Sequence, residues 1–309
     1  MARPAQNEYH VGWMCALLVE LEAATAMLDE DHGTIKGGGR DQNTYRAGRI
    51  HDHNVVIACP PVGIDGPVVA AHVATHMIRT FEQLKFILLV GIGGGLPDSE
   101  KDVDIRLGDV VVGVPSGTSG GVIHYDKGKA KHGGAFELKG TLNAPPYALL
   151  TAITALQVQP RSDRGRPMLG YLSDMVHGYP RYGMPSRRKD RLFHLRYPHP
   201  EGQTNCDQCL PSHEITRNSR KTTEPQIHYG IIASGNKVVK DPHLRDNLRA
   251  SYGALCVEME SAGLANISPS LTVRGICNYA DSHKNDEWHP YAAATAAAWT
   301  KELLLFVTA

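Results

Sequence analysis

Apolar runs of strand length recur along the chain and are separated by segments with helical spacing. The pattern predicts strands at residues 9–16, 44–50, 54–59, 86–90, 227–233, 255–257 and 272–277, and helices at 19–28, 67–81, 261–267 and 289–307. Apolar strands that alternate with helices are typical of a sheet whose two faces are both covered. We therefore predict an α/β fold with one such sheet at its centre.

Two of these strands end in polar clusters. The run at 255–257 breaks into Glu258, Met259 and Glu260, and the run at 272–277 breaks into Asn278. Ligands of such sheets bind outside the carboxyl ends of the strands, so we expect these two adjacent core strands to converge on a ligand. The carboxylates would accept hydrogen bonds from hydroxyl groups, and the methionine would offer an apolar wall. The competing interpretation is a capped helix with Glu260 in its first turn.

Two other strand ends carry candidate ligand contacts. Glu20 stands at the turn from the first strand into the first helix, where a helix N-terminal charge is the plainer interpretation. A glycine run directly follows the strand at 86–90, with Gly91, Ile92, Gly93 and Gly94. Such glycines let backbone N–H groups approach an anion or a ribose, although a plain turn explains them equally well. The run matches neither a Walker loop nor a dinucleotide-binding GxGxxG.

Composition excludes several classes of partner. The chain has 309 residues, which suits one large domain or one domain with an insertion. Lys plus Arg (32) equals Asp plus Glu (32), so no net charge draws the chain to nucleic acid or to acidic membranes. No apolar run reaches membrane-spanning length, and residues 1–10 lack signal-peptide character. The six cysteines do not form a disulfide framework, and we expect a cytoplasmic protein.

The segment at 160–226 differs from the rest of the chain, because it is rich in Arg, Pro, His and Tyr and poor in aliphatic runs. Between 161 and 196 it holds nine basic and three acidic residues, a net charge of plus six in a neutral chain. We interpret it as an insertion within a single domain spanning 1–309, since it lacks a core of its own. Cys206 and Cys209, with His199 and His213 nearby, have half the spacing of a structural zinc site. That signal is too weak to predict a metal.

Two motifs carry a resemblance to a known family. Residues 257–263 read VEMESAG and residues 273–281 read VRGICNYAD. This resembles the purine nucleoside phosphorylase and nucleosidase superfamily, and is most similar to the fungal branch often found as the N-terminal domain of nucleotide-binding immune receptors. The similarity extends from Tyr9 to Leu305. The resemblance implies a three-layer αβα fold around a twisted mixed sheet, no cofactor, and a homodimer.

The resemblance also implies roles for single residues. Glu258, Met259 and Glu260 would hold the ribose. The family's Asp that handles the proton at purine N7 corresponds to Asn278, and Glu20 would activate water. The glycine run would line the site. Contacts to the base would come from Ser234, Asn236 and Val238.

Hydrolysis is favoured over phosphorolysis. Phosphorylases of this fold hold phosphate with arginines from the first turn and a hydroxyl in the glycine loop, whereas this chain has Glu20 and Ile92 there. A carboxylate beside a phosphate dianion is repulsive. We predict a purine nucleosidase that acts on an adenine nucleoside or nucleotide, with ATP as a candidate. Basic residues that would approach a 5′-polyphosphate are Arg181, Arg187, Arg188 and Lys189. The alternative is a solvated basic loop.

Asn278 departs from the family pattern. An amide donates a hydrogen bond to N7 but cannot give up a proton. We interpret Asn278 either as an introduced substitution that traps substrate or as the mark of a slow or inactive protein. The alternative function is a non-catalytic nucleotide-sensing domain of a larger immune receptor. A phosphate-dependent phosphorylase and a generic α/β binding protein are favoured least.

Overall fold

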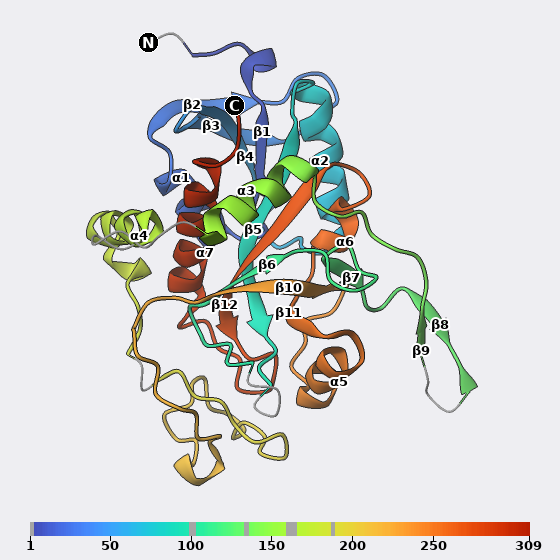
Figure 1. Ribbon diagram of the computed structural model, residues 1–309, viewed down its shortest axis with the longest axis vertical. Helices are drawn as coiled ribbons and strands as arrows, with labels where there is room; N and C mark the ends of the chain where they lie inside the picture. The colour runs from blue at the N-terminus through green and yellow to red at the C-terminus, as the bar shows by residue number, and fades with distance from the viewer. Residues whose placement is uncertain (1–2, 99–102, 133–135, 159–165, 187–188) are drawn as a thin grey trace.

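The fold is a layered arrangement of helices and strands, seen in a computed structural model that describes residues 3–98, 103–132, 136–158, 166–186 and 189–309 (Figure 1). The helices are α1 (Leu18–Ala26), α2 (Pro67–Thr80), α3 (Tyr147–Val158), α4 (Pro167–Gly178), α5 (Pro242–Tyr252), α6 (Ser261–Leu264) and α7 (His289–Leu304). The strands are β1 (Val11–Met14), β2 (Glu30–Lys36), β3 (Thr44–Ile50), β4 (His53–Ala58), β5 (Phe86–Gly95), β6 (Val110–Gly113), β7 (Val122–His124), β8 (Gly128–Ala130), β9 (Phe136–Leu138), β10 (Ile227–Ser234), β11 (Ala254–Glu258) and β12 (Ser270–Asn278). None of the helices in the described part of the chain combines the length and apolar character that crossing a bilayer requires.

A ten-stranded mixed sheet forms the centre, in the order β11-β10-β6-β12-β5-β1-β4-β3-β2, with β7 paired to β10. The neighbours of β5 in this order, β12 and β1, both run parallel to it, whereas β12 and β6 are antiparallel. β11 also pairs with β5, so that β5, β12, β6, β10 and β11 close on themselves. This closure brings the carboxyl ends of β11 and β12 to the same central strand.

Helices cover both faces of the sheet (Figure 1). Buried residues of α1, α3, α4 and α7 share one core with β1, β5 and β12, and those of α2 and α6 share another core on the opposite face. The alanines of α7 permit close approach to β12, where a methyl group at Gly275 would overlap the backbone of Ala292. The predicted three-layer α/β fold with a covered mixed sheet is confirmed.

The segment at 160–226 is less uniform than the sequence pattern predicts. It contains α4, whose Met168, Leu172 and Met175 are buried in the same core as α7. Their spacing of four and three residues is helical, so the signal is present in the sequence although basic residues around it obscure the pattern. The irregular part is the later portion, 179–226. Its described residues bond to the loop after β12, since Arg217 donates to Tyr279 and the His199 N–H donates to Ser282. This portion is called the basic insertion below.

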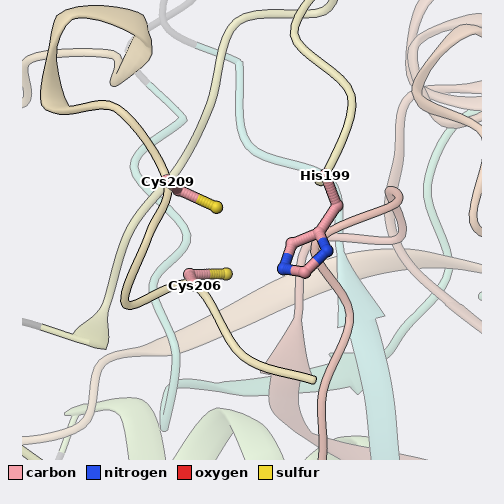
Figure 2. Close-up of side chains that lie close together, drawn as sticks. All are labelled: His199, Cys206 and Cys209. Carbon is pink, nitrogen blue, oxygen red and sulfur yellow. The ribbon is translucent and has the colours of Figure 1, made fainter. Parts of the chain in front are cut away.

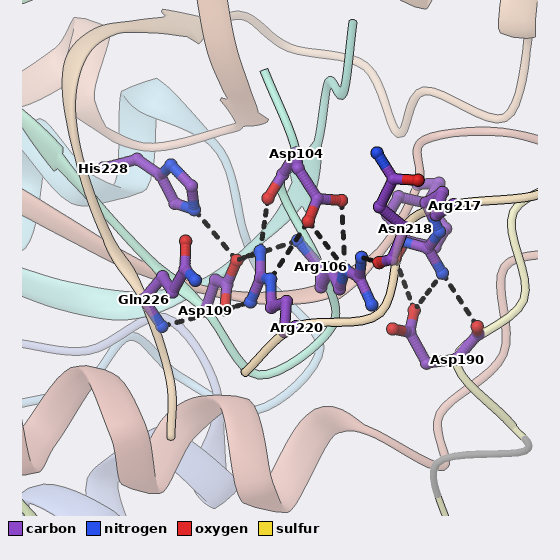
Figure 3. Close-up of polar contacts among 10 residues, drawn as sticks. Asp104, Arg106, Asp109, Asp190, Arg217, Asn218, Arg220, Gln226 and His228 are labelled. Atoms are coloured by element: carbon purple, nitrogen blue, oxygen red, sulfur yellow. Dashed lines mark hydrogen bonds and ion pairs between the residues drawn. The ribbon is translucent and has the colours of Figure 1, made fainter. Parts of the chain in front are cut away.

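The basic insertion is anchored to the sheet at Asp109, the residue before β6 (Figure 3). Its side chain is buried and accepts hydrogen bonds from Arg220 at 2.7 Å and from His228 at 2.8 Å. The backbone N–H groups of Arg106 and Gln226 also donate to it, each at 2.9 Å. Burial alone would raise the pKa of Asp109, but the bonds from His228 and Arg220 hold that pKa below its usual value.

We expect Asp109→Asn to lower the free energy of unfolding by about 3 kcal/mol near neutral pH, because it leaves the Arg220 guanidinium without its buried counter-charge. The folded pKa of Asp109 lies below the unfolded value. The stabilisation is therefore complete above about pH 4 and is lost as the pH falls through the folded pKa. Urea unfolding should show the difference from wild type narrowing on acidification. Asp104 pairs with the same Arg220 but its side chain is 35% exposed. Asp104→Asn should cost less than about 1 kcal/mol, and equal losses would contradict this account.

Candidate active site

The ends of β11 and β12 meet at Gly94 of β5. Val257 of β11 and Asn278 of β12 are both register partners of this glycine. The two strand ends therefore converge, as the sequence pattern predicts. They do so through a third strand, because within the described sheet β11 and β12 each pair with β5 and not with each other. The polar residues that follow β11 are thus placed beside the last residue of β12.

The glycine run is part of β5, which continues to Gly95, so the predicted loop after residue 90 is wrong. A methyl group at Gly91 would overlap Glu20 Oε1 and Arg274 Nη1, and one at Gly93 would overlap the sulfur of Cys256. The missing side chains make room for larger polar groups against an extended strand. The glycines therefore serve close packing around the site.

A cavity of about 220 Å³ opens at this junction. Its wall includes most of the residues that the sequence singles out, namely Glu20, Ile92, Gly93, Gly94, Val238, Glu258, Met259, Glu260 and Asn278. It also includes polar residues that the sequence pattern does not indicate, namely Asp65, Lys237, Lys284 and His289. Those four come from loops and a helix start, whose positions depend on the tertiary fold.

Two of the predicted base contacts, Ser234 and Asn236, are not among the residues that line the cavity. Ser234 ends β10 as a buried residue, and its hydroxyl accepts a hydrogen bond from the Ala262 N–H at 2.9 Å. Asn236 is exposed, and its backbone N–H donates to Asp126 at 2.8 Å. Neither residue lines the cavity, since the direction of a side chain after a strand depends on the turn that follows it.

Of the predicted phosphate contacts, the two that the structure describes, Arg181 and Lys189, are not among the residues that line the cavity. Arg181 pairs with Glu22 and lies over the ring of Tyr182. Lys189 pairs with Glu287 at 2.6 Å. Arg187 and Arg188 lie outside the described residues. The net positive charge of the insertion is thus partly used in salt bridges with acidic residues of other segments.

Arg274 lies inside β12 and organises the acidic side of the cavity. It is fully buried (0% exposed). Its Nη2 donates to Glu258 and, at 3.1 Å, to Glu260 Oε2, and its Nη1 lies 4.0 Å from Glu20 Oε1. A charged residue within an apolar strand must find buried partners, and this is the sequence signal that points to Arg274.

Two of the carboxylates also have structural partners. Glu258 accepts from the backbone N–H of Ser261, at the start of α6, at 3.1 Å. Glu20 accepts from the N–H groups of Ala16 at 2.6 Å and Ile92 at 2.7 Å. Glu20 and Glu258 therefore each place a negative charge at a helix start and also line the cavity. Glu260 has fewer partners, since besides Arg274 it accepts only a longer bond, 3.3 Å, from the Gly66 N–H among the described residues.

Three carboxylates share one guanidinium here, so the side of the cavity formed by Glu20, Glu258 and Glu260 carries excess negative charge. Burial raises the pKa of Glu260 to about 7, assisted by the charges of Glu258 and Glu20 and opposed by Arg274. Burial also raises the pKa of Glu20, against Arg274 and the backbone donors. This acidic side of the cavity favours a cation and repels an anion.

Asn278 is buried at the end of β12 with its amide held in place. Its Oδ1 accepts from the Ala280 N–H at 3.0 Å, and its Nδ2 lies 3.0 Å from the sulfur of Cys277. Ala280 has a positive φ of 51°, which turns the chain sharply after the strand. Asp281 accepts from the His283 N–H at 2.9 Å and from Arg245 at 3.4 Å, and so caps the following loop as expected.

Because the pKa of Glu260 is raised to about 7, we expect the affinity of the cavity for a ligand that carries hydroxyl groups to depend on pH. The ionised carboxylate accepts hydroxyl donors strongly, and protonation removes this capacity. With adenosine as the probe, the affinity should therefore fall up to about tenfold for each pH unit below 7 and be constant above about pH 8. Titration calorimetry across this range measures it. Glu260→Gln should flatten the profile, whereas an unchanged profile in that variant would assign the dependence to another group.

The sequence model of the phosphorylase superfamily matches residues 11–308. The chain belongs to the phosphorylase superfamily. The chain is 42% identical over 308 residues to a nucleotide-binding leucine-rich repeat (NLR)-like protein of Hyaloscypha variabilis. That match covers 98% of the chain and 30% of the relative, so the chain spans less than a third of that relative's length. It is also 38% identical over 84 residues to the ATP nucleosidase Cap17 of Escherichia coli, a match that covers 25% of the chain and 17% of Cap17.

Solved structures share the fold of this phosphorylase-superfamily chain. An aspartate-to-asparagine mutant of the Helicobacter pylori 5′-methylthioadenosine/S-adenosylhomocysteine nucleosidase, with 5′-methylthioadenosine in its active site, aligns with a TM-score of 0.59. The alignment covers 96% of this chain and 98% of the nucleosidase at 17% sequence identity. At that identity the likeness establishes the fold.

Proposed function

We propose that this chain is a purine nucleosidase that hydrolyses the N-glycosidic bond of an adenine nucleoside or nucleotide. The observation that carries the proposal is the presence of Glu260 and Asn278, from two strand ends joined at Gly94, in the wall of one cavity. Glu260, with Met259 beside it, would hold the ribose, and Asn278 would hold the leaving base at N7. Glu20, in the same wall, would orient or activate the attacking water.

The charge of the site supports hydrolysis. Cleavage of the glycosidic bond develops positive charge on the ribosyl group, which three buried carboxylates would stabilise. The same carboxylates repel a phosphate dianion, and the buried Arg274 is engaged by Glu258 and Glu260. A phosphate-dependent phosphorylase therefore remains the least favoured candidate.

Two relatives support adenine as the base. Cap17 is named an ATP nucleosidase, and the H. pylori nucleosidase mutant holds 5′-methylthioadenosine. That mutant carries an asparagine in place of an aspartate and has its ligand in the active site, so an Asp-to-Asn change in this fold is compatible with a bound nucleoside. We propose the same for Asn278, which would hold the substrate without supplying a proton.

The second candidate is a nucleotide-sensing domain without turnover. The match to an NLR-like protein more than three times as long favours it, as does the amide at residue 278. Incubation of the purified chain with adenosine, AMP, ADP or ATP, followed by chromatography of the products, separates the candidates. Many adenines per chain and free ribose, independent of phosphate, support the nucleosidase. If both wild type and Asn278→Asp bind the nucleotide without releasing adenine, the result would support the sensing domain and exclude the nucleosidase. Ribose 1-phosphate would indicate a phosphorylase.

The substrate's 5′ end would meet cations at the cavity wall, with Lys237 and Lys284 in place of the arginines expected from the sequence. Lys284 is half-buried, and no acidic partner of its Nζ is found among the described residues. Asp65 lies in the same wall and would repel a phosphate. The phosphate groups would therefore have to bind directly at the two lysines. Lysine acts on phosphate as a compact point charge. A 5′-phosphorylated nucleotide is therefore the substrate class that this wall fits.

Lys284→Gln should weaken ATP binding about tenfold or more and leave adenosine binding within about twofold, because only the nucleotide meets the lysine charge. Calorimetric Kd values for both ligands, measured in the absence of turnover, test this. Lys189→Gln is the matched control, since Lys189 pairs with Glu287 away from the cavity, and it should change neither value. If Lys284→Gln and Lys189→Gln change the Kd of ATP equally, Lys284 does not contact the 5′-phosphate groups.

A homodimer is proposed on an apolar surface next to the site. A second cavity, of about 840 Å³, shares Ala16 and Leu17 with the active-site cavity. Among its lining residues, Leu18 is 65% exposed and Val62 is 99% exposed. A second copy of the chain would cover them. Light scattering should give twice the 33.7 kDa mass of the chain, and a monomer at high concentration would exclude the proposal.

A further inference from the structure

The basic insertion contains a compact group of metal-ligating side chains, His199, Cys206 and Cys209 (Figure 2). Their ligand atoms all lie within 4.8 Å of one another, and both cysteines are free thiols. Figure 2 shows the two sulfur atoms and the imidazole facing one shared space. The ligands of a tetrahedral zinc ion lie about 3.3 to 3.8 Å apart, so a small inward movement would complete such a site.

The backbone around this group is held in position. The Cys209 N–H donates to the Cys206 carbonyl at 3.0 Å, which forms a tight turn that presents both sulfurs. Arg191 donates to the carbonyl oxygens of both cysteines. His199 Nε2 lies 2.9 Å from the Asn205 carbonyl oxygen, which orients the ring. His213, the other histidine near the cysteines in sequence, stacks on Tyr197 at 4.3 Å and is not part of the group.

A further histidine, His283, lies close to His199 and Cys206 although it belongs to a different part of the chain. His283 is buried (8% exposed), and neither of its ring nitrogens has a hydrogen-bond partner in the described structure. Its Nδ1 lies 3.6 Å from Asp281 Oδ1, and its ring stacks on that of Phe193. Its ring centroid is 5.4 Å from that of His199, and its carbonyl oxygen is 3.7 Å from Cys206 Sγ. Its ring nitrogens lie outside the 4.8 Å group, so ligation requires the side chain to rotate. A buried ring nitrogen without a hydrogen bond, as His283 Nε2 is, carries a free-energy cost that a metal ion would remove.

We propose that this group binds one structural Zn²⁺ ion, with His283 as the fourth ligand. Thiolate and imidazole ligands select zinc, whereas Ca²⁺ and Mg²⁺ prefer oxygen ligands. Burial raises the pKa of Cys206 to about 12, so binding near neutral pH releases the protons of both thiols. The ion would join the basic insertion to the loop at 281–285, which follows Asn278 and carries Lys284. It would therefore hold one wall of the active-site cavity in place.

Metal analysis of the full chain, purified without a metal-affinity tag, tests the proposal. We expect about one zinc per chain in wild type and less than about a tenth of that in His199→Ala and in Cys206→Ser. His213→Ala is the matched control and should keep its zinc, because His213 stacks on Tyr197 instead. Retention of full zinc in His199→Ala, or none in wild type after incubation with zinc, would overturn the proposal.

Two measurements on the wild-type chain test the zinc site even if the substituted variants fail to fold. Replacement of the ion by Co²⁺ should give thiolate-to-cobalt charge-transfer absorption and the spectrum of a tetrahedral ion. Chelation should lower Tm by about 5 °C or more, with recovery on zinc addition. His283→Ala should weaken zinc affinity at least about tenfold, and unchanged affinity would exclude His283 as a ligand. Absence of the cobalt absorption would exclude thiolate ligation.

Discussion

Asn278→Asp should raise the rate of adenine release at least about a hundredfold, because it supplies a general acid at the leaving base. The buried position favours this role. One oxygen of the introduced carboxyl would keep the hydrogen bond from the Ala280 N–H, now 3.0 Å long, and the other would carry the proton. Burial disfavours the ionised form of a carboxyl group, as it does for Glu260, so burial at residue 278 would favour the protonated form of the new acid.

Single-turnover measurements with adenosine and ATP test this expectation, and Asp281→Asn is the control. Asp281 is committed to Arg245 and to the His283 N–H, so its replacement should leave the rate of adenine release by the chain with Asn278 unchanged. An unchanged rate in Asn278→Asp, with substrate binding intact, would show that residue 278 is not at the leaving base. Loss of the residual rate in Asp281→Asn would instead identify Asp281 as the acid.

Arg274→Met should lower the free energy of unfolding by about 3 to 5 kcal/mol at pH 8, because it leaves buried carboxylates without their counter-charge. Arg274 is fully buried and contacts Glu258 and Glu260 directly. Without it the pKa values of these carboxyl groups rise further, so the variant can recover stability by taking up protons. The loss should thus be smaller near about pH 5 than at pH 8. Nucleoside binding should also weaken, since Glu260 would lose its orientation.

Urea unfolding at the two pH values measures the effect, and two variants separate charge from geometry. Arg274→Lys keeps the charge but loses the planar fork, and should recover only part of the stability. Arg274→Met combined with Glu258→Gln removes one uncompensated charge, and should be more stable than Arg274→Met alone. If Arg274→Met is as stable as wild type at pH 8, the carboxylates do not depend on the guanidinium.

The pattern of apolar residues and helix-start signals was sufficient to predict most of the central strands and helices. Strands β5, β10 and β12 are short apolar runs, and α2 and α7 begin with proline in the first turn, so their periodicity and punctuation identify them. β2 escaped prediction because this edge strand is largely polar and exposed. The residues Glu258, Met259, Glu260 and Asn278 were recognisable because each follows an apolar strand directly and because the motifs resemble those of a known family.

The sequence by itself determined the α/β class, the covered sheet and the two polar strand ends, since these depend on the order of residues within a few turns of chain. Only the tertiary structure decided which of those ends meet, because the contact of β11 with β12 passes through Gly94. It also decided that Arg274 serves three carboxylates, that Lys284 lines the cavity in place of Arg181, and that His283 approaches Cys206. Each of these contacts joins segments far apart in the chain, and the free energy that fixes them comes from burial and charge pairing, which no local pattern encodes.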